Sequence, residues 1–134
     1  MPIVVIVKTE EDYKQWLAEQ KGVKEAAQAD AGKPLTQDEL LAKGKDVYAS
    51  NCAACHMAGG EGMPGTFPAI KGSKVAQGSL ADHVKLVLKG KGAMPAFADQ
   101  LSDAELAAVV TYQRNGFGND KGDSIQPAEV QQYK

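Results

Sequence analysis

The sequence predicts an all-α domain of three main helices packed around a large bound group. Three stretches carry apolar residues at helical spacing behind a serine or threonine cap, and the segment between the first two is dense in glycine and proline. Aromatic side chains make up only 6% of the 134 residues, so helices of this size give a thin core by themselves. Two cysteines and a histidine also stand together at residues 52–56, with a spacing that suits the attachment of a cofactor.

The start of the chain is expected to form an extension. Residues 1–7 are apolar and mostly β-branched, which suits a strand buried in a sheet, although no later segment supplies the rest of a sheet. Thr9 and Asp12 then resemble a capping box that opens a short helix. Residues 24–34, rich in alanine, lysine and glutamine, are typical of a linker.

The compact part is expected to begin with a helix behind Thr36. Thr36 and Glu39 have the spacing of a capping box, and apolar residues follow at helical spacing. Cys52 is expected at the end of this helix. Residues 58–72 contain too much glycine and proline for a regular element, so something other than a strand ladder must hold them in place.

A second helix is predicted behind Ser79. Asp82 follows the cap three residues later, and Gly90 stops the helix. The glycine-flanked loop after this helix contains Met94, which is braced by Pro95.

The last strong helix is predicted behind Ser102, which has a capping-box partner in Glu105. On the first helix, Gly44 interrupts the apolar stripe that leads to Tyr48. A glycine in a helix costs about 1 kcal/mol relative to alanine, so this one indicates the close approach of another helix. The last helix, near Tyr112, is the expected partner.

These elements divide the chain into an extension (residues 1–35), a compact domain (36–118) and a polar tail (119–134) with one helical turn after Pro127. The formal net charge of −2 argues against a nucleic-acid partner, because phosphate binding needs a basic excess. No apolar stretch approaches the roughly 20 residues of a membrane span, and no export signal is evident. We therefore expect a single domain with no membrane span in this chain.

The pair Cys52 and Cys55, followed directly by His56, is the strongest chemical signal. With two cysteines in the chain, a disulfide framework is excluded. A thiol oxidoreductase would place the pair at the start of a helix after a parallel strand, and no such pattern precedes it. A structural zinc site needs four ligands. The cysteine pair together with His83, the only other histidine, leaves that set one short. The favoured interpretation is two thioether bonds to a haem whose iron takes the following histidine.

A haem held in this way needs a second axial ligand from its opposite face, and Met94 is the best candidate. A methionine thioether favours ferrous iron and raises the potential. Met57 follows the proximal histidine directly and is poorly placed to reach the other face. Met63 lies in the loop close to the anchor, His83 is expected to be solvated at the start of a helix, and Met1 lies outside the compact part.

Three motifs together resemble class I cytochrome c: Cys-Ala-Ala-Cys-His at 52–56, Thr-Phe-Pro-Ala-Ile at 66–70 and Gly-Ala-Met-Pro-Ala-Phe at 92–97. With the final helix, the resemblance covers residues 36–118. Gly44 and Tyr48 also match the positions at which the first helix of this family crosses the last. The combination of motifs is highly specific, and it implies the class I cytochrome c fold.

The resemblance also implies a set of site residues around one covalent haem c. Cys52 and Cys55 form the thioether bonds. His56 is the proximal ligand of the iron and Met94 the distal one. The carbonyl of Pro68 accepts a hydrogen bond from the second ring nitrogen of the proximal histidine, which fixes the orientation of the ring.

A second resemblance concerns the extension. Residues 1–5 (Met-Pro-Ile-Val-Val) and 11–17 (Glu-Asp-Tyr-Lys-Gln-Trp-Leu) are similar to the end of the copper domain of cytochrome c oxidase subunit II. In that family, a methionine at the place of Met1 is a ligand of the binuclear copper centre. The other copper ligands are absent from this chain, so the resemblance implies a copper centre only in a longer parent protein. It implies the arrangement of caa-type oxidases, in which subunit II carries a cytochrome c domain at its carboxyl end.

Together the resemblances imply a one-electron relay in a haem-copper terminal oxidase. The relay accepts an electron from a donor cytochrome or membrane complex and passes it to the copper domain, at the periplasmic or outer face of the bacterial inner membrane. The alternative is a free electron-shuttling cytochrome c unrelated to an oxidase. A haem enzyme or gas sensor needs an open distal site, and Met94 argues against one.

Residues 71–91 form the one basic stretch, with five lysines against the single Asp82. The lysines are Lys71, Lys74, Lys85, Lys89 and Lys91. This pattern is equally typical of a solvated helix face and of a docking surface that steers redox partners.

Overall fold

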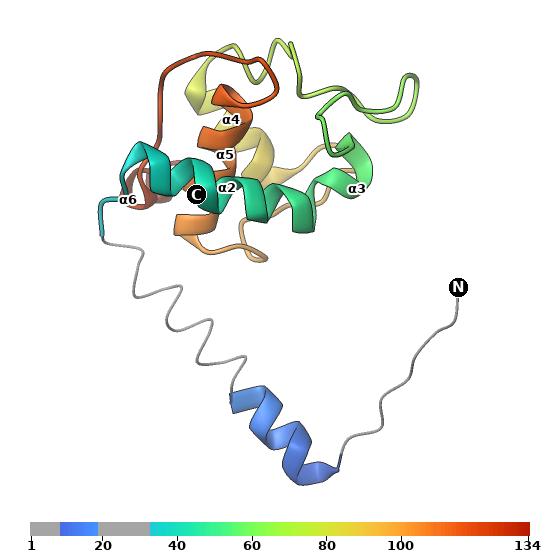
Figure 1. Ribbon diagram of the computed structural model, residues 1–134, viewed down its shortest axis with the longest axis vertical. Helices are drawn as coiled ribbons and strands as arrows, with labels where there is room; N and C mark the ends of the chain where they lie inside the picture. Colours follow the sequence, from blue (N-terminus) through green and yellow to red (C-terminus); the bar gives the residue numbers. More distant parts are fainter. Residues whose placement is uncertain (1–8, 19–32) are drawn as a thin grey trace.

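The computed structural model describes residues 9–18 and 33–134, and Figure 1 shows the helices in order. The named elements are α2 (Gln37–Asn51), α3 (Ala53–His56), α4 (Leu80–Lys89), α5 (Asp103–Asn115), α6 (Pro127–Val130) and the 3-10 turn η2 (Gln131–Tyr133). Within the described ranges the chain has isolated β-bridges but no strand, which confirms the prediction of an all-α fold. The strand expected over residues 1–7, and most of the expected linker, lie outside the described residues.

The start of each main helix is fixed by the cap that the sequence predicts. The Thr36 hydroxyl accepts a hydrogen bond from the N–H of Glu39, whose carboxylate accepts one from the N–H of the cap residue. Ser102 and Glu105 form the same capping box at the start of α5. Ser79 caps α4 by accepting from a backbone N–H in the first turn. Each cap satisfies N–H groups that the helix itself leaves without partners, and is worth about 1 kcal/mol.

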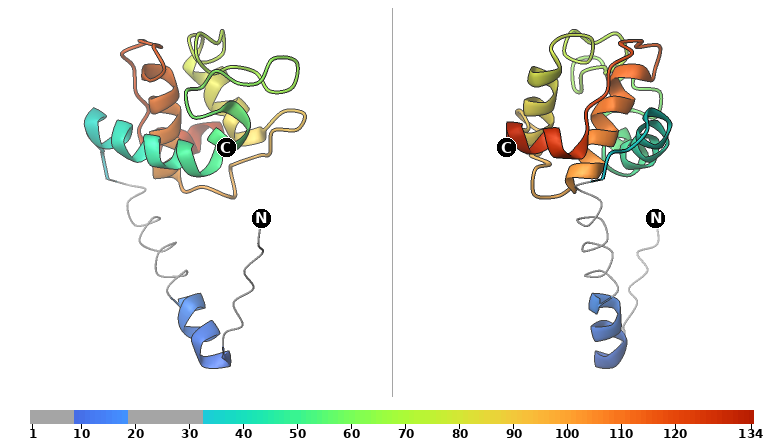
Figure 2. Two further views of the ribbon diagram at one scale, coloured as in Figure 1. Left: turned by 45° about the vertical axis from the view of Figure 1, so that its right-hand side comes forward. Right: turned by 90° about the vertical axis from the view of Figure 1, so that its left-hand side faces the viewer.

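The crossing of α2 over α5 forms the centre of the fold, as Figure 1 shows. At this crossing a β-carbon on Gly44 would lie 2.6 Å from Cβ of Tyr112 and would overlap the carbonyl oxygen of Ala108. The ring of Tyr48 packs beside that of Tyr112, with 5.8 Å between the centroids. These contacts confirm that the glycine marks the close approach of the last helix. In the right-hand view of Figure 2, α5 stands between α2 and α4.

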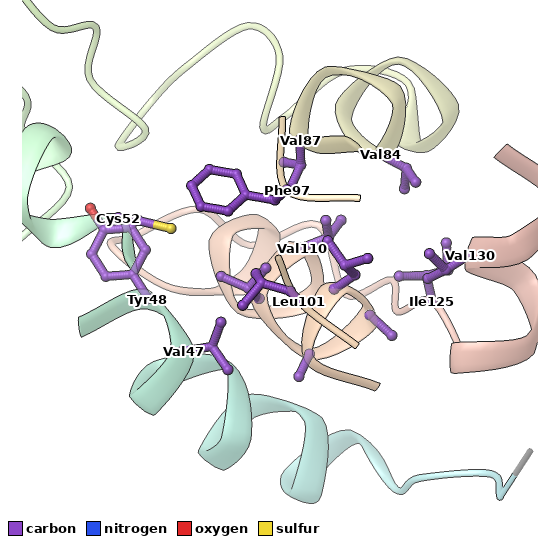
Figure 3. Close-up of a cluster of buried hydrophobic side chains, with 14 of the residues drawn as sticks. Val47, Tyr48, Cys52, Val84, Val87, Phe97, Leu101, Val110, Ile125 and Val130 are labelled. Atoms are coloured by element: carbon purple, nitrogen blue, oxygen red, sulfur yellow. The ribbon is translucent and has the colours of Figure 1, made fainter. Parts of the chain in front are cut away.

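The hydrophobic core surrounds α5 and is shown in Figure 3. Its members come from every main helix and from the tail, and include Leu40, Val47, Tyr48, Val84, Val87, Leu88, Phe97, Leu101, Leu106, Val110, Ile125 and Val130. Cys52 belongs to the same cluster, and its sulfur points into the interior on the side where the Phe97 ring lies. The first thiol of the cysteine pair therefore faces the core.

The tail packs against this core, which its polar composition did not predict. Ile125 and Val130 are each only 1% exposed. The side-chain amide of Gln126 bonds both backbone groups of Leu35, at 2.9 Å to the N–H and 2.9 Å to the carbonyl. The single helical turn predicted here is present as α6. Residues 119–134 thus run from the end of α5 back to the entrance of α2.

An ion pair between a buried arginine and a half-buried aspartate ties the tail to the end of α5. The guanidinium of Arg114 donates to the two carboxylate oxygens of Asp123 at 2.8 and 2.7 Å, and to the carbonyl of Gly78 at 2.9 Å. Arg114 is 1% exposed. These hydrogen bonds lower the pKa of the Asp123 carboxyl below its ordinary value, because they stabilise its charged form.

Residues 10–18 form the short helix predicted in the extension. The Thr9 hydroxyl donates to the carboxylate of Asp12 at 2.7 Å and accepts from its N–H at 3.3 Å. Tyr13 and Trp16 are 52% and 42% exposed, and their rings stack with 6.0 Å between centroids. Every helix within the described ranges is too short or too polar to span a bilayer.

Candidate functional site

The two cysteines lie where α2 passes into the one-turn helix α3. Cys52 caps the end of α2, and its carbonyl accepts hydrogen bonds from the N–H groups of Cys55 and His56 at 3.2 and 2.9 Å. Residues three apart on such a turn share one face. Both thiols are free, and the first is buried while the second is exposed. The turn therefore presents two separate thiols at the edge of the core.

His56, the last residue of α3, is held by a loop that lies beside it. Its Nδ1 is 2.7 Å from the carbonyl oxygen of Pro68. A carbonyl only accepts, so Nδ1 donates in this bond, and Nε2 is the ring nitrogen left to bind a metal. The loop also contacts the backbone of this residue, because the N–H of Gly62 donates to the His56 carbonyl at 2.9 Å. A β-carbon on Gly62 would lie 2.7 Å from the carbonyl carbon of Pro68, so the two sides of the loop touch directly.

The residue after the histidine has a strained backbone. Met57 has φ 65° and ψ 157°, a region in which residues other than glycine are rare. Its carbonyl accepts a hydrogen bond of 2.7 Å from the hydroxyl of Tyr48 and another of 3.1 Å from the N–H of Gly60. Burial raises the pKa of the Tyr48 hydroxyl above its ordinary value, so the group stays protonated as a donor. The two bonds hold the strained turn in place.

Met94 lies in a tight loop after α4. Gly90 ends the helix with φ 68°, and a β-carbon there would overlap the Met94 carbonyl oxygen, so the loop needs a glycine at this place. Lys91 and Met94 exchange two backbone hydrogen bonds of 3.1 and 3.0 Å. The N–H of Phe97 donates to the Val87 carbonyl at 3.2 Å, which returns the loop to the helix. The Met94 side chain is half-buried and packs against the core.

His83, one of the weaker alternatives for the distal ligand, is buried, so the expectation of a solvated histidine is wrong. It is 4% exposed, and its Nε2 lies 2.8 Å from Oε1 of Gln113 on α5. Burial lowers the pKa of His83 to about 4, so the ring is neutral at pH 7 and donates from Nε2. A neutral imidazole with this partner is compatible with an apolar contact between two helices. Gln113 also reaches Cys52, with 4.0 Å between its Nε2 and the sulfur.

The remaining alternative ligands are placed less favourably than Met94. Met63 is 44% exposed and takes part in an isolated β-bridge with Phe67. Met57 occupies the strained turn directly after His56. Met1 lies outside the described residues.

The structure also bears on the rival interpretations of the cysteine pair. Burial, and to a lesser degree the neighbouring Cys55, raises the pKa of the Cys52 thiol to about 11. A thiol oxidoreductase instead needs a thiolate at neutral pH, and hence a lowered pKa. In the described part of the chain, no three His, Cys, Asp or Glu side chains gather as a set of metal ligands. The thiol and zinc interpretations therefore have no support in this geometry.

The donor set fits a covalent haem. Two thiols at the edge of an apolar core, an imidazole with a free Nε2 and a thioether in a separate loop are the groups that c-type haems use. The structure brings Cys52, Cys55 and His56 together on one turn and adds Pro68 to them. Met94 is contributed by the loop after α4.

Asn119 is a residue near the site that the sequence did not reveal. It is 1% exposed, and its side chain bonds the loop that carries Pro68. Its polarity and its place in the tail indicated a surface position. The clearest sign in the sequence was Phe117 between two glycines, an aromatic residue in an otherwise polar segment.

Comparisons with known proteins agree with this geometry. The family model Cytochrome C oxidase, cbb3-type, subunit III matches residues 39–112. Cytochrome c6 of Cladophora glomerata is 41% identical over 87 residues, which cover 62% of this chain and 96% of that protein. The cytochrome c subunit of a quinone alcohol dehydrogenase from Gluconobacter oxydans is 35% identical over 126 residues, covering 77% of this chain and 26% of that protein. The Cbb3-type cytochrome c oxidase subunit CcoP of an Azospirillum species is 37% identical over 95 residues, covering 65% of this chain and 30% of that protein.

The chain thus spans nearly the whole cytochrome c6 relative and less than a third of each of the two subunits. The family model covers most of α2, the cysteine pair, α4 and most of α5, which are the elements that build the site. The chain therefore belongs to this cytochrome c family: it has the all-α class I fold, binds one covalent haem c and carries single electrons.

Proposed function

We propose that Cys52 and Cys55 attach the haem through thioether bonds and that His56 and Met94 are its axial ligands. The observation that carries this assignment is the 2.7 Å bond from His56 Nδ1 to the Pro68 carbonyl, because it fixes the ring and leaves Nε2 for the iron. The same bond raises the basicity of the ring. A thioether on the opposite face favours ferrous iron. When bound, the haem supplies the one-electron couple between ferric and ferrous iron.

We further propose that the chain relays electrons to the copper centre of a haem-copper terminal oxidase. Two observations support this: the matching family model and the Azospirillum relative both carry the name of an oxidase subunit. The resemblance of residues 1–17 to the end of a subunit II copper domain points to the same partner. A domain tethered to its acceptor works at high effective concentration, so a weak contact surface suffices. The domain then lies on the periplasmic side of the bacterial inner membrane. The resemblance to cytochrome c implies this location, because the family attaches its haem outside the cytoplasm.

The basic stretch is the surface best suited to contact with redox partners. All five lysines of residues 71–91 are exposed. Lys85 and Lys89 lie one turn apart on α4, on the face away from the core. Positive charge near the loops that carry Pro68 and Met94 steers acidic partners and speeds their encounter with the domain.

The ligand assignment is tested by visible spectra of the oxidised and reduced protein, made with the haem-attachment machinery. We expect a c-type spectrum with the weak far-red band of a methionine–iron bond. Met94→Ala removes this band, whereas Met63→Ala, in the other loop, keeps it. A colourless protein, or a band that survives Met94→Ala, contradicts the assignment. Carbon monoxide binds rapidly to the reduced Met94→Ala variant and slowly to the parent; rapid binding to the parent would indicate an open distal site.

A free electron-shuttling cytochrome c is the second candidate, favoured by the near-complete coverage of the cytochrome c6 relative. The two functions differ in their acceptor. Stopped-flow mixing of the reduced chain with an isolated oxidase copper domain tests the relay, which predicts rapid reduction of the copper. Lys85→Glu slows this step and Lys45→Glu, an exposed lysine on α2, leaves it unchanged. A copper domain that stays oxidised while small soluble acceptors are reduced supports the free shuttle.

A further inference from the structure

The segment after α5 holds the loop on which Pro68 lies. The ring of Phe117 covers Gly60, where a β-carbon would lie 2.8 Å from the ring. The carbonyl of Gly60 accepts the N–H of Ile70 at 2.8 Å, so the two ends of the loop meet beneath the ring. The backbone of residues 60–70 is therefore clamped from outside the loop.

Asn119 makes the most complete set of contacts in this clamp. Its Oδ1 accepts from the N–H of Gly72 at 2.8 Å and from Nε2 of Gln77 at 3.1 Å. Its Nδ2 donates to the carbonyls of Ile70 at 3.0 Å and Gln113 at 2.9 Å. The orientation of the amide is fixed by its partners, because a backbone N–H only donates and a carbonyl only accepts. All four hydrogen-bonding positions of a side chain that is 1% exposed are thus in use.

These contacts form a short path from the tail to the proximal histidine. Ile70, which Asn119 holds, is two residues from Pro68, whose carbonyl accepts from His56 Nδ1 at 2.7 Å. The last contact in the path sets how strongly the imidazole donates electrons to a metal, because a hydrogen bond to the second ring nitrogen raises ligand basicity. Gln113 anchors the other side of the Asn119 amide to α5, so the loop is tied to the most buried helix of the fold.

We propose that Asn119 is a positioning residue for the proximal ligand, holding the Pro68 carbonyl against His56 through the backbone of Ile70. The proposal rests on the proposed role of His56 as an axial ligand. Asn119 makes its hydrogen bonds with residues other than the histidine, and acts through the length of the bond between His56 Nδ1 and the Pro68 carbonyl oxygen. Loss of its amide lengthens this bond, makes the imidazole a weaker donor and raises the reduction potential.

The test uses the haem-loaded full chain and compares Asn119→Leu with Asn115→Leu. Asn115 is a matched control: its amide makes hydrogen bonds of 2.8 Å to the carbonyls of Thr111 and Asp123 and to the N–H of Gly122, all within α5 and the tail. Two readouts are followed, the exchange rate of the His56 Nδ1 proton in the reduced protein by NMR and the reduction potential. Asn119→Ala is the second variant, since it removes the amide without placing a larger or charged group at this buried position.

We expect exchange of the Nδ1 proton to be about tenfold faster in Asn119→Leu, with a higher potential, and wild-type values for both in Asn115→Leu. Asn119→Ala shows changes in the same direction, and it decides the question if Asn119→Leu fails to fold. Unchanged exchange and potential in the Asn119 variants, or equal changes in Asn115→Leu, overturn the proposal. Failure of the ligand assignment is seen separately, because the His56 ring protons of the reduced wild-type protein would then lack the strong upfield shift that the haem ring current gives to an axial imidazole.

Discussion

His83 and Gln113 form a buried hydrogen bond between α4 and α5, with 2.8 Å between Nε2 of the histidine and Oε1 of the glutamine. Burial lowers the pKa of the histidine to about 4 from an ordinary 6.5. Between these pH values the unfolded chain binds a proton that the folded protein does not bind. Burial of His83 between the two helices therefore makes the stability of the fold depend on pH in the acid range.

We predict that His83 lowers the free energy of unfolding as the pH falls from about 6.5 to about 4, by about 3 kcal/mol at most. Above this window the histidine is neutral in both states and has no such effect. Urea unfolding of the haem-loaded protein at several pH values measures the loss. In His83→Gln the loss between pH 6.5 and pH 4 is smaller by the same amount. Equal pH dependence in the two proteins contradicts the prediction.

Gly44→Ala is predicted to lower the free energy of unfolding by about 1–3 kcal/mol, because the added methyl group overlaps the backbone of α5. Chemical unfolding measures this. Lys45→Ala, at the next position and exposed, serves as the control and stays within about 0.5 kcal/mol of the parent. A stabilised Gly44→Ala protein, as expected for an uncrowded helix glycine, would show that the two helices are not in contact there.

Asp123→Ala is predicted to destabilise the protein by about 2–3 kcal/mol, because it leaves the buried guanidinium of Arg114 without its carboxylate. The tail should also become accessible to proteases, since the ion pair ties it to α5. The exposed Asp120, three residues earlier, provides the control variant Asp120→Ala. Limited proteolysis and unfolding curves that are the same for both variants would refute a structural role for the ion pair.

Tyr48→Phe is predicted to lower the free energy of unfolding by about 1 kcal/mol, because it removes one hydrogen bond to the strained Met57. Tyr112→Phe is the matched control: its ring lies in the same aromatic cluster, and its hydroxyl makes no hydrogen bond within the described part of the chain. Unfolding free energies of the two variants give the difference directly. If Tyr112→Phe lowers the free energy of unfolding as much as Tyr48→Phe does, the hydrogen bond from the Tyr48 hydroxyl does not stabilise the fold as predicted.

Much of the fold was predictable because its signals are local. The caps at Thr36, Ser79 and Ser102 each depend on residues within one turn, and the structure has all three. The close approach at Gly44 was predictable because a glycine within an apolar stripe weakens its helix, and tight packing against a second helix offsets that loss. The cysteine pair and the following histidine form a motif whose chemistry depends on spacing alone.

The rest depends on contacts between residues far apart in the chain. His83 looked solvated because a polar side chain is buried only where it has a hydrogen-bond partner, and Gln113 lies thirty residues away. Asn119 looked like part of a polar tail for the same reason, since its bond partner Ile70 is forty-nine residues earlier. Composition gives no sign of such pairings, because side chains such as those of Gln113 and Asn119 are exposed in most proteins.

The two hydrogen bonds between Gln126 and Leu35 have a mechanical consequence. Beyond Leu35 the chain runs through α2, a helix of 15 residues and about 22 Å, before it reaches Cys52. A pull on the chain ahead of Leu35 is resisted first by the tail at α6, on the far side of this helix from the Pro68 loop. The whole length of α2 therefore separates the hydrogen bonds that hold Leu35 from the cysteine pair.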